Sequence, residues 1–404
     1  MTFAAILAVA LLFVETGNSS EDPNMNRARS LAKKLTIIDT HIDVPYRLRK
    51  KEVDISRRTE SGDFDYVRAR DGGLDAAFMS IFTPAEYEGQ GRSKELADSL
   101  IDMVEGFAVR WPDRFGVATS AAEVIELKSL GRFALLLGME NGSPIEGDLA
   151  NLRYFHGRGV RYITLAHAKD NHLCDSSYDD SETWGGLSSF GRRVVREMNN
   201  LGIMIDVSHV SDETFYQVMR LSEAPVIASH SSCRQFTPGW QRNMSDDMIK
   251  LLAKNGGVIH INFGSVFISD ECRRRFYAGK DKADEFAREN GLDAKDKAVK
   301  EFRDHYFKEY PVGFADVTEV ADHIDHVVGL VGVEHVGFGS DFDGVGDSLP
   351  TGLKDVSYYP SLVKELLVRG YSDSDLEKIC SGNLLRVWRE VERIAGEMNS
   401  TKRD

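Results

Sequence analysis

Eight short apolar runs, each followed by a longer stretch of helical character, limit most strongly how this chain can fold. Near-continuous apolar runs of this length are typical of strands covered on both faces, as in a parallel sheet. Eight strand-then-helix units predict a (β/α)8 TIM barrel, an α/β fold that a chain of 404 residues can form as one unit. The predicted strands span residues 36–43, 75–82, 133–141, 160–168, 203–209, 225–231, 257–264 and 335–344.

The barrel is predicted to occupy residues 30–392 as a single domain, followed by a polar tail at 393–404. Residues 265–316 form a long, highly charged insertion of helical character after the seventh strand. Long insertions in compact domains often serve a function, so this one is either a lid or dimer contact beside the strand ends, or a solvated helical excursion. The chain as a whole is expected to form a homodimer.

Residues 1–29 are interpreted as a signal-like or anchor segment with a polar linker. The apolar run Phe3–Val14 is too short to span a membrane but has the length of a signal-peptide core, although no Lys or Arg precedes it. We therefore expect an exported protein, periplasmic or extracellular, with membrane association through this segment as one option. A mis-set start or a simple tail, and with it a cytoplasmic location, is the alternative.

Charge and cysteine content argue against several classes of protein. The formal net charge of −14 disfavours a nucleic-acid partner, which requires a basic face. The four cysteines are widely scattered and include no CxxC pair, so neither a zinc ribbon nor a disulfide framework is indicated.

Six of the eight predicted strands end in His, Asp or Glu, and in a barrel those ends converge on the face where active sites are built. A lone strand histidine is more often a hydrogen-bonded core residue, but this joint placement favours a site. Imidazoles and carboxylates without thiolates suit divalent ions, zinc first, and the set exceeds what one tetrahedral ion needs. Two ions sharing a carboxylate are therefore predicted. The residues are His41 and Asp43, Glu140, His167, His209, His230 and Asp341.

Seven motifs in this order resemble the membrane (renal) dipeptidase family: "DTHIDVP", "GMENG", "RYITLAH", "IDVSHV", "IASHSS", "GSDFDG" and "GNLLRV". Members of that family are binuclear zinc peptidases on a (β/α)8 barrel, and the resemblance covers roughly residues 30 to 392. It implies that His41 and Asp43 hold one Zn²⁺ and that His209 and His230 hold the other. It also implies that Glu140 bridges both ions, with a hydroxide between them.

The resemblance further implies catalytic and substrate-binding roles for three residues. Asp341 would be the acid/base carboxylate, and His167 would contact the substrate and support the tetrahedral intermediate. Arg242 would hold the C-terminal carboxylate of the substrate, a task that suits a guanidinium fork. Arg242 lies one residue farther from its histidine than is typical of the family, and Arg234 is nearby. In the first strand, Asp39 is expected to brace the ligands as a hydrogen-bond partner.

Three functions are compatible with these residues. The first is a zinc dipeptidase that cleaves L,L and L,D dipeptides. The second is another binuclear barrel hydrolase, acting on an N-acyl amino acid, a lactone or a phosphoester, in which a carboxylated Lys169 would replace Glu140 as the bridge. The third is a non-catalytic barrel that serves as a binding protein, since fold alone does not guarantee function.

Overall fold

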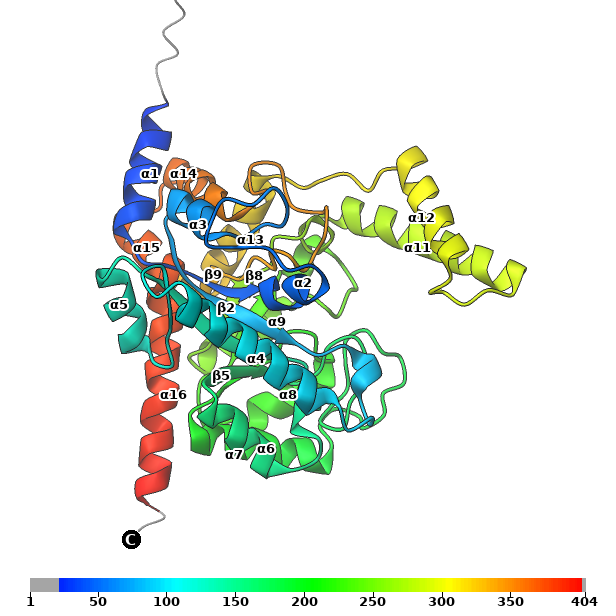
Figure 1. Ribbon diagram of the computed structural model, residues 1–404, viewed down its shortest axis with the longest axis horizontal. Helices are drawn as coiled ribbons and strands as arrows, with labels where there is room; N and C mark the ends of the chain where they lie inside the picture. Colours follow the sequence, from blue (N-terminus) through cyan, green and yellow to red (C-terminus); the bar gives the residue numbers. More distant parts are fainter. Residues whose placement is uncertain (1–21, 402–404) are drawn as a thin grey trace, which may run out of the picture.

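The computed structural model describes residues 22–401 and contains all eight predicted strands. They pair in parallel in the order β1-β2-β4-β5-β6-β7-β8-β9, with helices outside them (Figure 1). The strands are β1 (Ile37–Ile42), β2 (Leu74–Phe82), β4 (Phe133–Glu140), β5 (Val160–Thr164), β6 (Met204–Asp206), β7 (Ile227–Ser231), β8 (Val258–Ile261) and β9 (Val336–Phe338).

The barrel is closed by the segment just after β9, which pairs with the end of β1. Ile42 forms a parallel bridge with Phe342, the backbone N–H of Asp341 donates to the carbonyl of His41 at 3.1 Å, and the N–H of Asp43 donates to the carbonyl of Phe342 at 2.8 Å. The predicted (β/α)8 barrel is therefore confirmed. Closure also places the chain after β9 directly against the end of β1.

Two details of the strands differ from the prediction. A ninth strand, β3 (Phe115–Val117), pairs with β4 beside the barrel path, and its three residues are too few for a pattern to reveal. The strands predicted to end at residues 168, 209 and 344 stop at Thr164, Asp206 and Phe338. The chain leaves the sheet at these points, so the polar residues that follow lie in loops.

The helices alternate with the strands as predicted. They are α1 (Pro23–Lys34), α2 (Val44–Lys50), α3 (Tyr66–Gly72), α4 (Ser93–Arg110), α5 (Ala121–Ser129), α6 (Leu149–Gly157), α7 (Ser189–Leu201), α8 (Asp212–Leu221), α9 (Asp246–Lys254), α10 (Ser265–Ile268), α11 (Asp270–Asn290), α12 (Lys297–Glu309), α13 (Val317–Val331), α14 (Tyr359–Val368), α15 (Asp373–Glu377) and α16 (Asn383–Ser400). Short turns of helix are η1 (Ala85–Tyr87), η2 (Ser143–Ile145), η3 (Arg234–Phe236), η4 (Val333–His335), η5 (Val356–Tyr358) and η6 (Lys378–Gly382).

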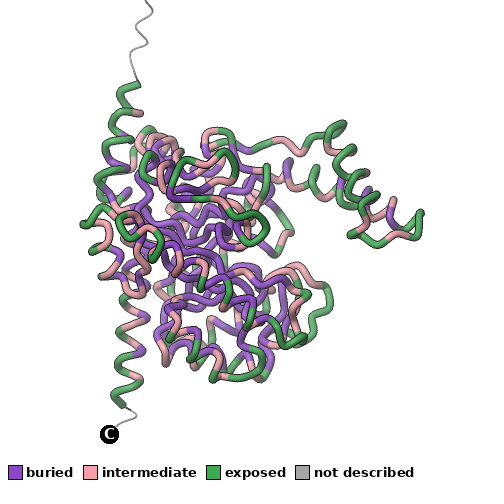
Figure 2. Tube along the Cα trace, viewed as in Figure 1, coloured by how far each residue is buried: buried purple, intermediate pink, exposed green. Residues whose placement is uncertain are grey.

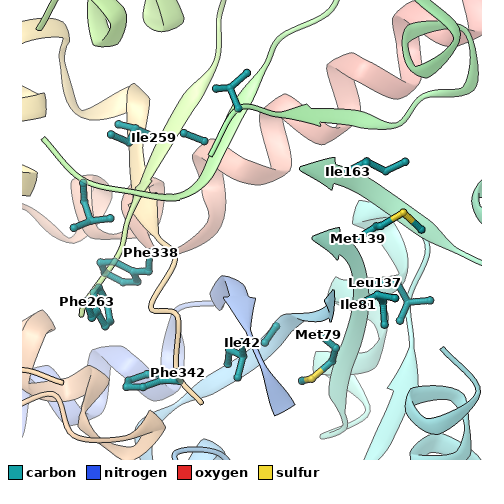
Figure 3. Close-up of a cluster of buried hydrophobic side chains, with 14 of the residues drawn as sticks. Ile42, Met79, Ile81, Leu137, Met139, Ile163, Ile259, Phe263, Phe338 and Phe342 are labelled. Atoms are coloured by element: carbon teal, nitrogen blue, oxygen red, sulfur yellow. The ribbon is translucent and has the colours of Figure 1, made fainter. Parts of the chain in front are cut away.

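The strands bury both faces, and the residues on the two faces belong to different clusters. On β4, Leu135, Leu137 and Met139 join the larger cluster, which includes residues of the surrounding helices and is shown in part in Figure 3. Leu136, between them, belongs to a second cluster. This alternation follows from the twofold period of a strand, and it explains why the strands read as continuous apolar runs.

The second cluster fills the barrel interior and is completed by the C-terminal helix. The ring of Phe78 on β2 lies 4.9 Å from that of Tyr162 on β5 and 5.6 Å from that of Trp388 on α16, measured between centroids. All three side chains are fully buried. Because apolar side chains pack the interior below, the polar residues are confined to the other end, where the strands finish.

The insertion after β8 is helical, as predicted, and α11 and α12 extend away from the barrel as an arm (Figure 1). Most of the arm is exposed or half-buried (Figure 2), and it carries a small core of its own around Ala283, Ala287 and Val299. In the loop between α11 and α12, Nζ of the exposed Lys295 lies 4.0 Å from a carboxylate oxygen of Glu86 in η1. Whether the arm acts as a lid or as a dimer contact stays a prediction.

Both ends of the described chain are helical. Helix α1 begins at Pro23, inside the segment interpreted as a linker, and Ala28 on this helix is buried. Helix α16 continues to Ser400, through most of the stretch interpreted as a tail. The apolar run Phe3–Val14 lies outside the described residues. Within residues 22–401, no helix combines the length and the apolar character needed to cross a membrane.

Candidate metal centre

The residues predicted from the strand ends come together at one end of the barrel. His41, Glu140 and His230 lie on strands β1, β4 and β7. Asp43, His167, His209 and Asp341 follow strands β1, β5, β6 and β9 in the loops. Three overlapping groups have ligand atoms that all lie within 4.8 Å of one another. These groups are His41 with Glu140 and His230, Glu140 with His167 and His209, and His41 with Asp43 and Asp341.

The carboxylate of Glu140 lies at the middle of the cluster. One of its oxygens, Oε2, is 3.3 Å from Nε2 of His41. The other, Oε1, is 3.3 Å from Nε2 of His209 and 3.5 Å from Nε2 of both His167 and His230. Burial raises the pKa of Glu140, but the imidazoles, His41 and His167 foremost, outweigh it and hold the pKa well below its usual range. Glu140 is thus a buried carboxylate with imidazole nitrogens on both of its oxygens.

Hydrogen bonds around His41 leave its Nε2 directed at two carboxylates. The hydroxyl of Tyr162 donates to the carbonyl of Thr40 at 3.0 Å, and its oxygen lies 2.8 Å from Nδ1 of His41. Since that hydroxyl has one proton, Nδ1 of His41 is the donor in the second contact. Nε2 then faces Glu140 at 3.3 Å and Asp43 at 3.5 Å.

The surroundings of His41 favour a positive charge beside Nε2. Burial lowers the pKa of His41, but Tyr162, Glu140 and Asp43 raise it more, so that it lies well above its ordinary value. A divalent cation between Nε2 and the two carboxylates satisfies the same electrostatic demand. The donor set around His41 therefore fits a metal ion.

His209 and His230 form the other side of the cluster. Their Nε2 atoms are 2.7 Å apart, and both face Oε1 of Glu140. Burial, reinforced by the charge of Arg242 on His209 and of His41 on His230, lowers the pKa of each imidazole well below its ordinary value. The neutral imidazole is the form that binds a metal, so these two nitrogens and Oε1 also fit an ion.

The loops after β6 and β9 hold two site residues in an unusual backbone conformation. His209 has φ +67° and Asp341 has φ +62°, the left-handed region in which non-glycine residues are strained. Such strain costs roughly 1–3 kcal/mol per residue and tends to occur at functional sites. A third constraint lies at Gly344, where an added Cβ would come within 2.1 Å of Asp341 Oδ1 and 2.3 Å of Asp43 Oδ2.

Asp341 lies beside Asp43 at the edge of the cluster. Its Oδ2 accepts a hydrogen bond of 2.8 Å from Nδ2 of Asn262. Burial and the neighbouring charge of Asp43 raise the pKa of Asp341 well above its ordinary value. Asp341 is therefore a carboxyl group whose surroundings favour the protonated form.

Of the two arginines considered from the sequence, the structure brings Arg242 to the cluster. Its Nη2 lies 3.1 Å from Nε2 of His209 and donates to the carbonyl of His230 at 2.6 Å, while Nη1 donates to Ser231 Oγ at 2.8 Å. Within the described residues, Nε of Arg242 has no hydrogen-bond partner. Arg234 instead forms a two-pronged ion pair with Asp212, at 2.7 and 2.6 Å.

His167 and Lys169 separate in the structure although they are neighbours in the sequence. His167 reaches Glu140, and its ring lies 4.7 Å from that of Phe82, measured between centroids. The side chain of Lys169 is 62% exposed, and its Nζ is 3.3 Å from a carboxylate oxygen of Asp179. This placement gives the carboxylated-lysine bridge no support.

Several polar contacts of the site could not be read from motifs. Asp39 braces the backbone rather than an imidazole ring: its Oδ1 accepts from the N–H of His41 and of Ser340, and its Oδ2 accepts from the hydroxyl of Tyr359. The partner of the His41 imidazole is Tyr162. Ser80 on β2 donates to Oε2 of Glu140 at 3.0 Å. In the sequence, these contacts are indicated only by the positions of Ser80 and Tyr162, which are polar residues at inward-facing positions of apolar strands.

A pair of carboxylates near the site predicts a pH-dependent stability. The backbone N–H of Asp63 donates to Asp343, and that of Asp343 donates to Asp63, while Arg47 pairs with Asp343 at 2.9 Å. Burial, with the charge of Asp343 second, raises the pKa of Asp63 to about 7. Because the pKa of Asp63 is higher in the folded chain than in the unfolded chain, proton binding at Asp63 favours the folded chain. This contribution to stability is fully present below the unfolded pKa of about 3.9, and it is lost as the pH rises through about 7.

Asp63→Asn is therefore expected to leave the melting temperature nearly unchanged at pH 4 and to raise it by a few degrees at pH 8. The amide keeps an acceptor for the N–H of Asp343 and carries no charge to desolvate. Thermal melts followed by circular dichroism at both pH values measure the difference. Asp113→Asn, in the exposed turn after α4, is the control. An equal shift at pH 4 and pH 8 would contradict the assignment.

The chain is similar to known proteins over nearly its whole length. The family model of the membrane dipeptidases (peptidase family M19) matches residues 25–402. Dipeptidase verJ of Clonostachys rogersoniana is 34% identical over 394 residues, which cover 94% of this chain and 90% of that protein. Dipeptidase 3 of Mus musculus is 33% identical over 389 residues, 92% of this chain and 68% of the mouse protein. The crystal structure of the probable dipeptidase PvdM from Pseudomonas aeruginosa superposes with a TM-score of 0.79 at 28% identity, covering 92% and 99% of the two chains.

Proposed function

This chain belongs to the membrane dipeptidase family, and we propose that it cleaves L,L and L,D dipeptides at two zinc ions bridged by Glu140. The coarser conclusion, that the chain is a metallodipeptidase, follows from the family itself. The observation that carries the proposal is the convergence of four imidazole Nε2 atoms on the two oxygens of one buried carboxylate. Zinc is the first choice because the donors are imidazoles and carboxylates without a thiolate.

In this proposal each ion has its own ligands and shares Glu140. His41 and Asp43 hold the first ion, and their facing atoms are 3.5 Å apart. His209 and His230 hold the second, with Nε2 atoms 2.7 Å apart. When bound, two such ions polarise the scissile carbonyl and lower the pKa of a water held between them.

The remaining residues of the site handle protons and charge. Asp341 takes the proton of the attacking water and delivers it to the leaving amine, a role that suits a carboxyl group whose pKa is raised by burial. Asn262 holds that carboxyl in place through its 2.8 Å hydrogen bond. His167, beside Glu140 and partly open to solvent, contacts the carbonyl oxygen that becomes negative during the reaction.

Arg242 is proposed to bind the C-terminal carboxylate of the dipeptide. Its guanidinium lies on the His209 and His230 side of the cluster. It packs over the ring of Phe267, 5.2 Å from the centroid, and forms a side-chain hydrogen bond with Tyr178. A carboxylate bound there would place the peptide bond of a dipeptide over the metal ligands, since only one residue separates the two groups. A substrate without a free C-terminal carboxylate would lose this charge-assisted contact.

The proposal extends to assembly and location. Pairing of two copies is also proposed, with the arm of α11 and α12 as the candidate contact because it extends away from the barrel (Figure 1). Export, with membrane association through the N-terminal segment, is proposed from the apolar run Phe3–Val14.

The test is an assay of the purified chain, with bound zinc quantified, against a panel of L,L and L,D dipeptides. We expect two zinc ions per chain, cleavage of dipeptides from both sets, and at least a tenfold loss of kcat/KM for C-terminally amidated versions. The amide is expected to lose one charge-assisted bond to Arg242, which is worth about 1.5–3 kcal/mol.

Other outcomes would change the proposal in defined ways. Two zinc ions without cleavage of any dipeptide would keep the metal centre and redirect the search to other amides and esters. A chain that binds no zinc would overturn the proposed centre. Equal cleavage of free and amidated dipeptides would remove Arg242 from the substrate site.

A further inference from the structure

Behind the metal ligands, at the end of β6, lies a fully buried carboxylate, Asp206. Its Oδ1 accepts from the backbone N–H of Ser208 at 3.0 Å and of Ser229 at 2.7 Å. Its Oδ2 accepts from the hydroxyls of Thr164 at 2.5 Å and of Ser229 at 2.6 Å. The four donors hold both oxygens of Asp206 in fixed positions and connect three neighbouring strands.

The hydroxyl of Ser229, which donates to Asp206, also contacts the proposed metal ligand His230. Ser229 Oγ lies 2.7 Å from Nδ1 of His230. A serine hydroxyl has a single proton, and in this structure that proton is directed at Asp206 Oδ2. The remaining contact of Oγ is therefore as an acceptor, and the proton between Ser229 and His230 is carried by Nδ1. Nε2 of His230 is left with its lone pair. This atom lies 2.7 Å from Nε2 of His209 and 3.5 Å from Glu140 Oε1, the two other groups proposed to hold the second ion.

We propose that Asp206 and Ser229 are positioning residues that hold His230 in the Nδ1–H tautomer and so keep Nε2 free to bind zinc. The inference deepens the proposed function and rests on His230 being a ligand. A histidine ligand is oriented by the group that binds its other ring nitrogen, and loss of such a group typically weakens metal binding 10- to 100-fold. Here the orienting carboxylate acts through a serine hydroxyl instead of touching the imidazole.

The three histidines that face Oε1 of Glu140 are not oriented alike. Within the described residues, Nδ1 of His209 and of His167 have no hydrogen-bond partner. His230 has the Ser229 contact, and its ring also stacks on His41 with centroids 3.8 Å apart. The tautomer of His230 is thus the one that this chain controls through a buried carboxylate.

The decisive variant is Asp206→Asn, which keeps the size and shape of the side chain. Its amide oxygen can still accept from the two backbone N–H groups, which leaves the NH₂ group facing Ser229 Oγ. The amide then donates to Ser229, and the hydroxyl turns to donate to Nδ1 of His230. The proton of the neutral imidazole moves to Nε2, where it competes with zinc.

Two measurements on the full-length chain read this change. Long-range ¹⁵N–¹H spectra before zinc addition report the tautomer of His230, assigned by the loss of its signals in His230→Asn. Competition with a chelator reports zinc affinity. We expect Nδ1–H in the parent chain, Nε2–H in Asp206→Asn, and a 10- to 100-fold weaker second zinc site in that variant. Thr164→Val is the matched control, because it removes another hydroxyl from the same oxygen without touching the path to His230.

Each outcome decides the inference. An Asp206→Asn chain that keeps Nδ1–H and binds zinc as tightly as the parent would overturn it, as would Nε2–H in the parent itself. If Asp206→Asn does not fold, Ser229→Ala replaces it, with a mixture of tautomers as the expected result and a pure Nδ1–H form as the contrary one. Failure of the dipeptide assay with these readouts as expected would reject the proposed substrate and leave the positioning role intact.

Discussion

Glu140→Gln is expected to abolish the binding of both zinc ions and to lower kcat/KM by at least about a thousandfold. The carboxylate of Glu140 faces the ligand nitrogens of both proposed ions, through Oε2 on one side and Oε1 on the other. Glutamine retains one acceptor oxygen but loses the charge and presents an NH₂ group to one set of nitrogens. Metal-ion catalysis contributes several kcal/mol, and about 4 kcal/mol corresponds to a thousandfold in rate.

Zinc content by elemental analysis and dipeptide hydrolysis measure this effect together. Lys169→Ala is the matched control, since that lysine pairs with Asp179 and is largely exposed. The control is expected to keep both zinc ions and nearly all activity. Loss of zinc in Lys169→Ala, with retention in Glu140→Gln, would instead assign the bridge to the lysine and favour another class of binuclear hydrolase.

Asp341→Asn is expected to lower kcat between about a hundredfold and ten-thousandfold while both zinc ions stay bound. This range is what a positioned acid/base group typically contributes. The asparagine oxygen can still accept the hydrogen bond from Asn262, so the loop is expected to keep its position. Turnover is lost because an amide neither accepts nor delivers the proton. Zinc binding is retained because Asp341 is not one of the proposed ligands.

The zinc count separates acid/base chemistry from metal ligation at Asp341. Its carboxylate also forms a group with His41 and Asp43 that could hold a metal ion. If Asp341 is a ligand, Asp341→Asn will contain one zinc ion fewer than the parent chain. If it is the acid/base group, the count stays at two and the rate of the chemical step alone falls, as single-turnover measurements would show.

Local patterns were sufficient to predict the barrel and the residue types at its strand ends. A strand covered on both faces must be apolar throughout, so a charged or imidazole group at its end is conspicuous in the sequence. Glu140 shows this, since it terminates an eight-residue buried strand. The helical insertion was predictable for a similar reason, because its charges recur with helical spacing along residues 270–309.

The loop conformations were not predictable from these patterns. His209 and Asp341 were expected inside strands, and instead they follow the strand ends with left-handed backbones. Strand propensity is set by neighbours along the chain, whereas these two residues are held by distant segments. The N–H of Asp341 donates to the carbonyl of His41 on β1, and the carbonyl of His209 accepts from the N–H of Ser177 in the loop after β5. Closure of the barrel between Ile42 and Phe342 is one such contact.

The sequence by itself determined the order of the strands, the face on which the ionisable groups gather and their chemical types, because these depend on side-chain period and polarity. Only the tertiary structure decided which groups meet. Arg242 rather than Arg234 reaches the histidines because Asp212 already pairs with Arg234. Likewise, the tautomer of His230 depends on Asp206, twenty-four positions away in the chain but one strand away in the barrel, and hydrogen bonds between strands exist only once the barrel has formed.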